Sequence, residues 1–345
     1  MESGGHLIVV DSNIPAGRGK SPLLEFLEKR WYNDKKKKVD IDVLCISHPD
    51  LDHYHGMLEA LEFVLSGDKG RIRHVVFHGL LPAFKEALEP YQANLTGISN
   101  KATEGAVGVK GMKEYNRLCE LLKDLPFTEP GGCQSIPIAK ELKLDLLGPV
   151  WNTIRKYQKQ AVRTLLVSWS GENPEAVSPN PVSAVLRLEV EGIVVLLTGD
   201  MDSKSWRAAV ASHRPTKPEL YGPAHIVKAP HHGSGTDQDP NFWSEFLRTD
   251  GHAVISAGHR HRHPAEKTVR AIKRVVGPTR FFCTNVCSEY KKLQTPLSIH
   301  FRNETGSHSP CHPYHEAVTF KILKGGVRCT TGEPPTPACR HHCEE

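Results

Sequence analysis

Five side chains able to bind a metal ion fall within one short segment between His48 and His55. The segment reads Ser47-His48-Pro-Asp50-Leu-Asp52-His53-Tyr-His55-Gly56 and directly follows an apolar run. Imidazole and carboxylate groups together suit zinc, manganese or iron, and a mixed set of this size is able to hold two ions. Charged side chains at this density need partners wherever they are even partly buried. The segment therefore predicts a metal site rather than an incidental polar loop.

Two later segments place further ligand types directly after apolar strands. Leu196-Leu197-Thr198-Gly199-Asp200 ends on one carboxylate, and Val227-Lys228-Ala229-Pro230-His231-His232-Gly233 ends on a pair of histidines. Each is a weak signal by itself, since many strands end in a polar turn. Active sites of layered sheets are commonly assembled from loops at strand ends, so the three segments together are more informative than any one of them.

The elements that must position these residues alternate along the chain. Apolar runs predict strands at residues 7–11, 43–46, 73–77, 142–147, 182–190, 193–198, 226–229, 253–257 and 280–283. Helical spacing predicts helices at residues 21–31, 58–65, 112–125, 151–168, 203–212, 241–247 and 265–275. Strands that alternate with helices indicate a layered α/β or α+β architecture.

Taken in order, the motifs resemble those of the metallo-β-lactamase superfamily. That superfamily usually carries His-x-His-x-Asp-His-x-x-Gly, and here Asp50 replaces the second histidine, as in the hydrolase domain of ComEC-type DNA-uptake proteins. The same branch is matched by Asn180-Pro-Val-Ser183, by residues 196–200, by residues 230–234, and by residues 254–258 leading to His263-Pro264. The resemblance covers roughly residues 5–285. It implies an α+β, metallo-β-lactamase-like fold, a four-layer αβ/βα sandwich.

The resemblance also implies a site with two divalent transition metals, zinc or manganese. The implied ligands are His48 and Asp50 for one ion, Asp52 and His53 for the other, Asp200 as a bridge, and His231 or His232 to complete a coordination sphere. Asp11 would orient the ligand-bearing loop without itself binding a metal ion. Ser183 belongs to a segment that is placed to add a further contact to the site. Asp52 or Asp200 would accept a proton during catalysis, and His263 would contact a substrate oxygen. The isolated histidine of the superfamily's third motif has no evident counterpart.

The function that these features predict is metal-dependent hydrolysis of phosphodiesters, of phosphodiesterase or nuclease type. Two neighbouring metal ions would activate a hydroxide that attacks phosphorus. A nucleic acid or nucleotide is the expected substrate, and the net charge of +5 is compatible with a phosphate-bearing one. Two alternatives stay open: a hydrolase of another phosphoester, a lactone or a thioester, or a non-catalytic metal-containing binding or sensor module.

The predicted domain organisation is a hydrolase domain at residues 1–285, with an insertion near residues 96–111, and a Cys/His-rich appendage at residues 286–345. The candidate ligands for a structural zinc at this end of the chain are Cys283, Cys287, Cys311, Cys339 and Cys343. Their spacings do not match a regular zinc finger. Free cysteines packed in a small β appendage, built from residues 297–301 and 317–323, are therefore favoured over a structural zinc.

The N-terminal segment of the sequence shows no basic-plus-apolar signal pattern. Its longest apolar stretches have the length of a strand, well short of the roughly 20 residues that span a bilayer. These features predict a cytoplasmic protein with no membrane association.

Overall fold

The computed structural model divides the chain into two compact units. Unit 1 comprises Met1–Gly132 and Gly148–Ala184, and unit 2 comprises Cys133–Leu147 and Val185–Glu345. The structure describes residues 2–3, 6–14, 19–33, 38–78, 109–140, 142–169, 177–235, 239, 241–256, 264–277, 280–283, 318–323 and 326–331. None of the helices in these ranges has both the length and the apolar character of a membrane span.

Unit 1 contains a five-stranded sheet in the order β1-β2-β3-β4-β5. Its strands are β1 (Glu2–Ser3), β2 (His6–Val10), β3 (Val43–Ile46), β4 (Val75–Phe77) and β5 (Phe127–Thr128). β1 is antiparallel to β2, whereas β2, β3, β4 and β5 are parallel to their neighbours. Because these four strands are parallel, their carboxyl ends meet at one edge of the sheet.

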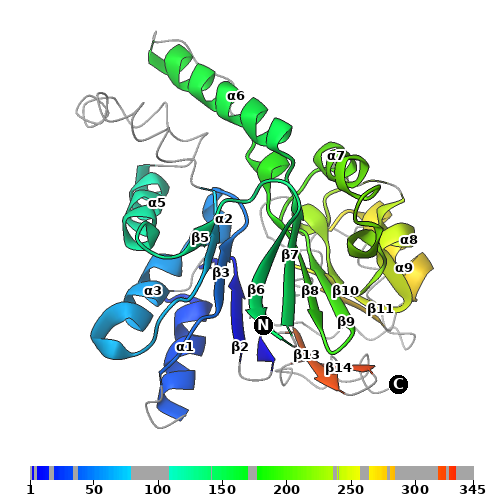
Figure 1. The fold of residues 1–345 in the computed structure, drawn as a ribbon, viewed down its shortest axis with the longest axis horizontal. Coiled ribbons are helices and arrows are strands. Elements are labelled where there is room, and N and C mark those ends of the chain that lie inside the picture. Colours follow the sequence, from blue (N-terminus) through cyan, green and yellow to red (C-terminus); the bar gives the residue numbers. More distant parts are fainter. Residues whose placement is uncertain are drawn as a thin grey trace, which may run out of the picture. The chain divides into compact units, whose positions relative to one another are not determined.

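Helices of unit 1 cover one face of this sheet (Figure 1). They are α1 (Pro22–Asn33), α3 (Met57–Leu65) and α5 (Val109–Leu122), and the unit also contains α2 (Leu51–Tyr54), η1 (Ser66–Asp68), α6 (Trp151–Trp169) and η2 (Asn180–Val182). Leu44 of β3 packs in one apolar cluster with Leu27 of α1 and Leu61 of α3. This cluster fixes the strands whose ends carry the polar residues.

Unit 2 contains a seven-stranded sheet in the order β12-β11-β10-β9-β8-β7-β6. Its strands are β6 (Gln134–Ala139), β7 (Leu142–Gly148), β8 (Val185–Val190), β9 (Ile193–Leu197), β10 (Ala224–Lys228), β11 (Leu247–Ile255) and β12 (Phe281–Cys283). β9, β10, β11 and β12 are parallel, while β8 is antiparallel to β9. A separate antiparallel pair is formed by β13 (Val318–Leu323) and β14 (Gly326–Thr331).

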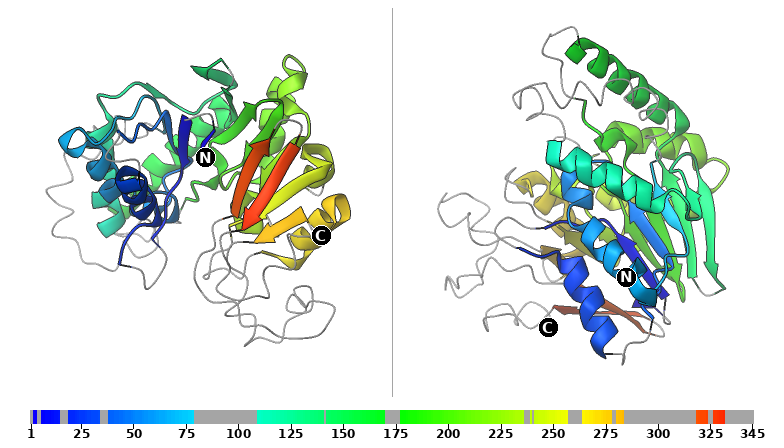
Figure 2. Two further views of the ribbon diagram at one scale, coloured as in Figure 1. Left: turned by 90° about the horizontal axis from the view of Figure 1, so that it is seen from below. Right: turned by 90° about the vertical axis from the view of Figure 1, so that its left-hand side faces the viewer.

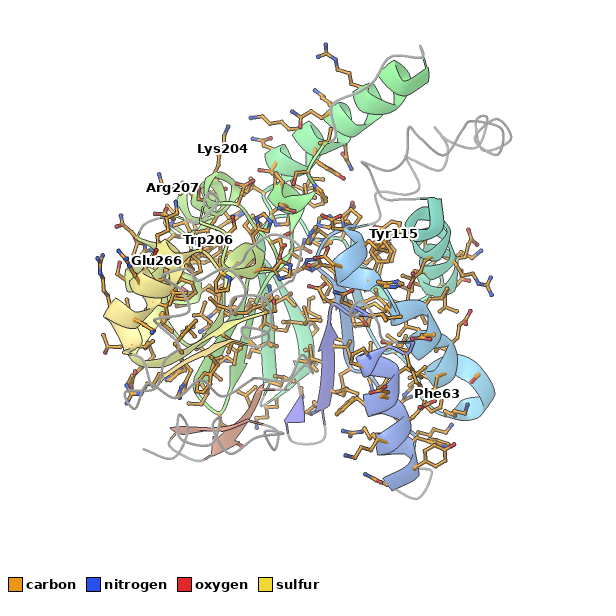
Figure 3. The ribbon with its side chains drawn as sticks, turned by 180° about the vertical axis from the view of Figure 1, so that it is seen from behind. Phe63, Tyr115, Lys204, Trp206, Arg207 and Glu266 are labelled. Atoms are coloured by element: carbon orange, nitrogen blue, oxygen red, sulfur yellow. The ribbon has the colours of Figure 1, made fainter. Side chains whose placement is uncertain are left out.

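The helices of unit 2 pack on one face of its sheet, as Figure 2 shows. They are α7 (Ser203–His213), α8 (Phe242–Phe246) and α9 (Glu266–Val276), with the short η3 (Pro218–Tyr221) and η4 (Pro230–Gly233). Trp206 of α7, labelled in Figure 3, contacts the rings of Tyr221, Phe242 and Phe246. These aromatic contacts tie α7 and α8 to the core of the unit.

The strands of unit 2 are apolar on both faces. Val185 of β8 belongs to the helix-side cluster, and its neighbours Leu186 and Leu188, on the alternate face, are also fully buried. A strand that is apolar on both faces is typical of a sheet covered on both sides. The predicted α+β class is confirmed, and each unit supplies one sheet and one layer of helices, as a four-layer sandwich requires.

The helices and strands expected from the sequence up to residue 283 are all present, most of them with shifted ends. Residues 180–182 form the 3-10 turn η2, so β8 begins at Val185 rather than at residue 182, and β11 begins earlier than expected, at Leu247. β6 was not predicted because Pro137 interrupts its pattern, but β6 lies at the sheet edge, where proline is tolerated. The predicted domain boundary at residue 285 and most of the predicted insertion lie outside the described residues.

Candidate metal centre

The carboxyl ends of three parallel strands of unit 1 bring polar side chains to one edge of the sheet. Asp11 follows β2, Ser47 and His48 follow β3, and His78 follows β4. The register aligns Val10 with Cys45 and Ile46 with Phe77, so these residues leave the sheet at the same level. The strand ends therefore gather residues that are far apart in the sequence.

Asp11 holds the loop that carries the predicted ligands. Its Oδ1 accepts a hydrogen bond from the Ser47 backbone N–H at 2.7 Å, and its Oδ2 lies 2.8 Å from both Ser47 Oγ and His53 Nδ1. Burial by itself would raise the pKa of Asp11, but the charge and hydrogen bond of His53, with the Ser47 N–H, lower it. The carboxylate of Asp11 therefore fixes the tautomer of His53 with the proton on Nδ1, so that Nε2 is unprotonated and able to bind a metal ion.

The four loop residues expected to bind metal form two neighbouring pairs. His48 Nε2 lies 3.9 Å from Asp50 Oδ2, and His53 Nε2 lies 3.8 Å from Asp52 Oδ2. The centroids of the two imidazole rings are 4.0 Å apart. Two ligand atoms that each lie about 2.1 Å from one ion are separated by roughly 3–4 Å, so each pair has the spacing of a shared metal.

A sharp turn at Gly56 closes the loop. Gly56 has a φ of +79°, and a Cβ there would lie 2.5 Å from Ile14 Cγ1, so only glycine fits. Glu114 of α5 caps the turn: its Oε1 accepts the Gly56 N–H at 2.8 Å, and its Oε2 lies 3.0 Å from His55 Nδ1. The sequence gives no sign of this role, because Glu114 is one acidic residue in an amphipathic helix.

His78 is a further buried residue at this edge that sequence reasoning missed. Its side chain is fully buried, and neither ring nitrogen has a hydrogen-bond partner of normal geometry among the described residues. Burial lowers the pKa of His78 to about 4, although the Val182 backbone partly opposes the shift. His78 is thus neutral at pH 7. Its position directly after the strand predicted at residues 73–77 was the available signal.

The segment with Asn180 and Ser183 reaches the same loop. Ser183 is fully buried and donates its backbone N–H to the Asn180 carbonyl at 3.0 Å. The next residue, Ala184, donates its N–H to the Ser47 carbonyl at 2.8 Å. Ser183 therefore lies one residue from a direct contact with the loop that carries the predicted ligands.

In unit 2 the ends of parallel β9, β10 and β11 gather a second polar cluster. Asp200 follows β9, His231 and His232 follow β10, and Ser256 follows β11. His231, His232 and Gly233 have φ values of +44°, +51° and +79°. Successive left-handed residues cost energy for side chains other than glycine, and such strain is concentrated at functional sites. The turn displays both histidines at the strand end.

His232 and Asp200 form the closest ligand pair of unit 2. His232 Nε2 lies 3.3 Å from Asp200 Oδ2. Its Nδ1 donates to the Ser256 carbonyl oxygen at 2.6 Å, which fixes the tautomer with Nε2 unprotonated and able to bind a metal ion. Lys228 Nζ lies 3.8 Å from Asp200 Oδ1 and donates to the Gly199 carbonyl at 3.1 Å. Sequence reasoning overlooked Lys228, which adds a positive charge beside this carboxylate.

Several predicted site residues fall outside the described part of the chain. They are His263, Cys287, Cys311, Cys339 and Cys343, while only the backbone of Cys283 is described, in β12. Of the predicted β appendage, the strand expected at residues 317–323 is present as β13, and residues 297–301 are not described. The structural zinc and the role of His263 stay predictions.

Of the comparisons with known proteins, only the one with solved structures gives matches. No protein-family model and no curated protein matches the chain. Among solved structures, the metallo-beta-lactamase fold protein YhfI from Bacillus subtilis aligns with 81% of this chain and 93% of that chain, at 11% sequence identity and a TM-score of 0.36. The sequence identity and the TM-score of this match are too low to indicate the fold or the function of the chain.

Proposed function

We propose that the chain is a metallohydrolase that uses two divalent transition metals, zinc or manganese, to cleave phosphodiesters. The observation that carries the proposal is the pairing in the unit 1 loop, where His48 lies beside Asp50 and His53 lies beside Asp52. Two neighbouring imidazole–carboxylate pairs are not expected in an incidental polar loop. A further carboxylate that orients one of the two imidazoles is typical of metal-binding sites.

The donor set fits such metals. Each pair combines an imidazole nitrogen with a carboxylate oxygen, the ligands that zinc and manganese accept. Asp11 accepts a hydrogen bond from His53 Nδ1, and the Ser256 carbonyl accepts one from His232 Nδ1. Metal-binding histidines typically hydrogen-bond in this way through the ring nitrogen that does not face the metal.

Asp200 and His232 would also hold metal. The basis for this assignment is the order of motifs, which resembles that of the ComEC-like branch. Within unit 2 the pairing of His232 Nε2 with Asp200 favours His232 over His231 as the ligand.

The chemistry follows from the residues around the ions. When bound, two divalent ions lower the pKa of water and neutralise charge on a phosphate. The Asp52 side chain is half exposed, so one of its oxygens is accessible to accept a proton from the attacking water. Lys228 places a positive charge 3.8 Å from Asp200 Oδ1, which is favourable for a carboxylate at this strand end.

Metal analysis and a chromogenic phosphodiester test the proposal. Protein loaded with Zn²⁺ or Mn²⁺ should contain more than one equivalent of metal and should hydrolyse bis(p-nitrophenyl) phosphate. Asp52→Ala and Asp200→Ala should each lower kcat by about a hundredfold or more, because water activation is lost. The exposed Asp124→Ala is the matched control and should retain wild-type turnover.

Two results would oppose the proposal. Retention of more than about a tenth of the turnover by either variant corresponds to under ~1.4 kcal/mol and would remove that residue's role. Metal binding without phosphodiester cleavage, but with hydrolysis of a lactone or thioester, would favour the alternative substrates. Metal binding without hydrolysis of any of these would favour a binding or sensor module.

A further inference from the structure

Helix α6 carries a row of basic side chains on one face. Arg155, Lys156, Lys159 and Arg163 are all exposed, and the helix from Trp151 to Trp169 contains no acidic residue. At 3.6 residues per turn these four residues fall within an arc of about 100° around the helix axis. Ile154, on the other side of the helix, is fully buried. We call these four residues the α6 ridge.

The α6 ridge differs from the other basic surfaces of unit 1. Arg71 and Arg73 pair with Asp40, Arg117 lies near Glu62, and Lys123 pairs with Glu120. Within the described residues, none of the four ridge side chains forms an ion pair. Paired surface charges are typical of a solvated face, whereas a row of cations with no acidic neighbour in its helix creates a local positive potential.

Helix α6 is connected to the loop that carries the predicted metal ligands through the η2 segment. α6 packs on η2, which ends at Val182. Two residues later, Ala184 donates its backbone N–H to the Ser47 carbonyl at 2.8 Å. The ridge residues therefore lie on the helix that packs on η2, next to the segment that contacts the loop, and α6 extends from there (Figure 1).

We propose that the α6 ridge binds the phosphate backbone of a polynucleotide whose scissile phosphodiester lies at the metal centre. This inference rests on the proposed function only for the position of the scissile group. Successive ridge residues Arg155, Lys159 and Arg163 are four residues apart, so their backbone positions are spaced by about 6 Å along the helix. A row of this kind contacts several phosphates of a polymer and only one of a small phosphodiester.

Electrostatics give the ridge a measurable signature. Each phosphate contact releases condensed counterions, so the logarithm of the binding constant falls with the logarithm of salt concentration, by about 0.7 per contact for a single strand. Loss of three contacts should therefore make this slope shallower by about 2. A small ester has a single phosphate and makes at most one contact with the ridge, so its hydrolysis should depend little on these residues.

The test compares two triple variants of the full chain. Arg155→Ala/Lys159→Ala/Arg163→Ala removes three of the four ridge charges, and Lys29→Ala/Arg117→Ala/Lys123→Ala removes the same charge from exposed positions on α1, on α5 and directly after α5. Binding is measured by fluorescence anisotropy with fluorescein-labelled dT20 and with a 20-base-pair duplex. Both sets are made in the Asp52→Ala background, so that cleavage does not interfere. Hydrolysis of bis(p-nitrophenyl) phosphate is measured with Asp52 intact.

The ridge variant should bind at least one of the two polynucleotides about tenfold more weakly at low salt, with the shallower slope, while the control variant binds as the parent does. Hydrolysis of the small ester should stay within twofold of wild type. Equal binding by the two triple variants would overturn the proposal, and so would a parallel loss of small-ester hydrolysis in the ridge variant. The binding comparison needs no turnover, so it stands even if the proposed hydrolysis is absent.

Discussion

The two polar clusters of this protein are built in different ways. The loop cluster of unit 1 (His48, Asp50, Asp52 and His53) comes from six consecutive residues and is held by the carboxylate of Asp11. The strand-end cluster of unit 2 (Asp200, His231 and His232) comes from two strand ends and is held by a backbone carbonyl and a left-handed turn. The first depends on side chains that mutation can remove, and the second depends mainly on backbone geometry.

This difference predicts where each cluster is sensitive. Neutralising the carboxylate that orients the loop should disturb the loop cluster. In the strand-end cluster the orienting carbonyl belongs to Ser256, and no substitution removes it. There, only the ligands themselves are expected to have large effects.

The largest expected effect separates the two adjacent histidines of the strand-end cluster. His232→Ala should lower kcat for bis(p-nitrophenyl) phosphate by about a hundredfold or more, because the imidazole beside Asp200 is lost. His231→Ala is the matched control and should retain most of the activity. Equal losses in the two variants would mean that the geometry of His232 does not identify the ligand.

A second effect concerns His78, which has no counterpart in the strand-end cluster. Its pKa in the folded state, about 4, lies below the ordinary value of 6.5. Between these values the unfolded chain binds a proton that the folded chain does not, so stability is present above pH 6.5 and falls as the pH decreases towards 4. The loss amounts to up to about 3 kcal/mol.

Urea denaturation of metal-free protein between pH 7 and pH 4.5 measures this loss. The His78→Leu variant should lose less stability over the window than wild type, because the buried imidazole is absent. If the free energy of unfolding falls with pH by the same amount in both proteins, His78 titrates normally and is not buried in the unit 1 core.

The smallest effect tests the two orienting groups directly. Asp11→Asn should weaken metal binding by roughly 10–100-fold, the usual cost of losing a group that orients a ligating histidine. Ser256→Ala removes only the Oγ contact to His232 at 3.2 Å and keeps the carbonyl contact at 2.6 Å, so its metal affinity should change by less than about threefold. Competition with a chromogenic chelator measures both. A larger effect at Ser256 than at Asp11 would reverse the comparison.

The loop cluster could be recognised as a candidate metal site from the sequence because its residues are contiguous. The buried strand β3 ends at Ile46, and the spacing of His48, Asp50, Asp52 and His53 needed no knowledge of the fold. Alternation and helical periodicity likewise predicted the helices and the central strands, since burial of one face imposes a period on the chain.

The sequence by itself determined the α+β class, the main elements and the ligand types, because apolar periodicity and residue chemistry are local properties of the chain. Only the tertiary structure decided which distant residues support them. Glu114 lies 58 positions from Gly56 in the sequence. His78 lies at the same edge of the sheet as Asp11 only because β2, β3 and β4 are parallel. The preference for His232 over its neighbour likewise depends on a left-handed turn and on the carbonyl of Ser256. Such contacts depend on strand order and register, which the pattern of a single strand does not encode.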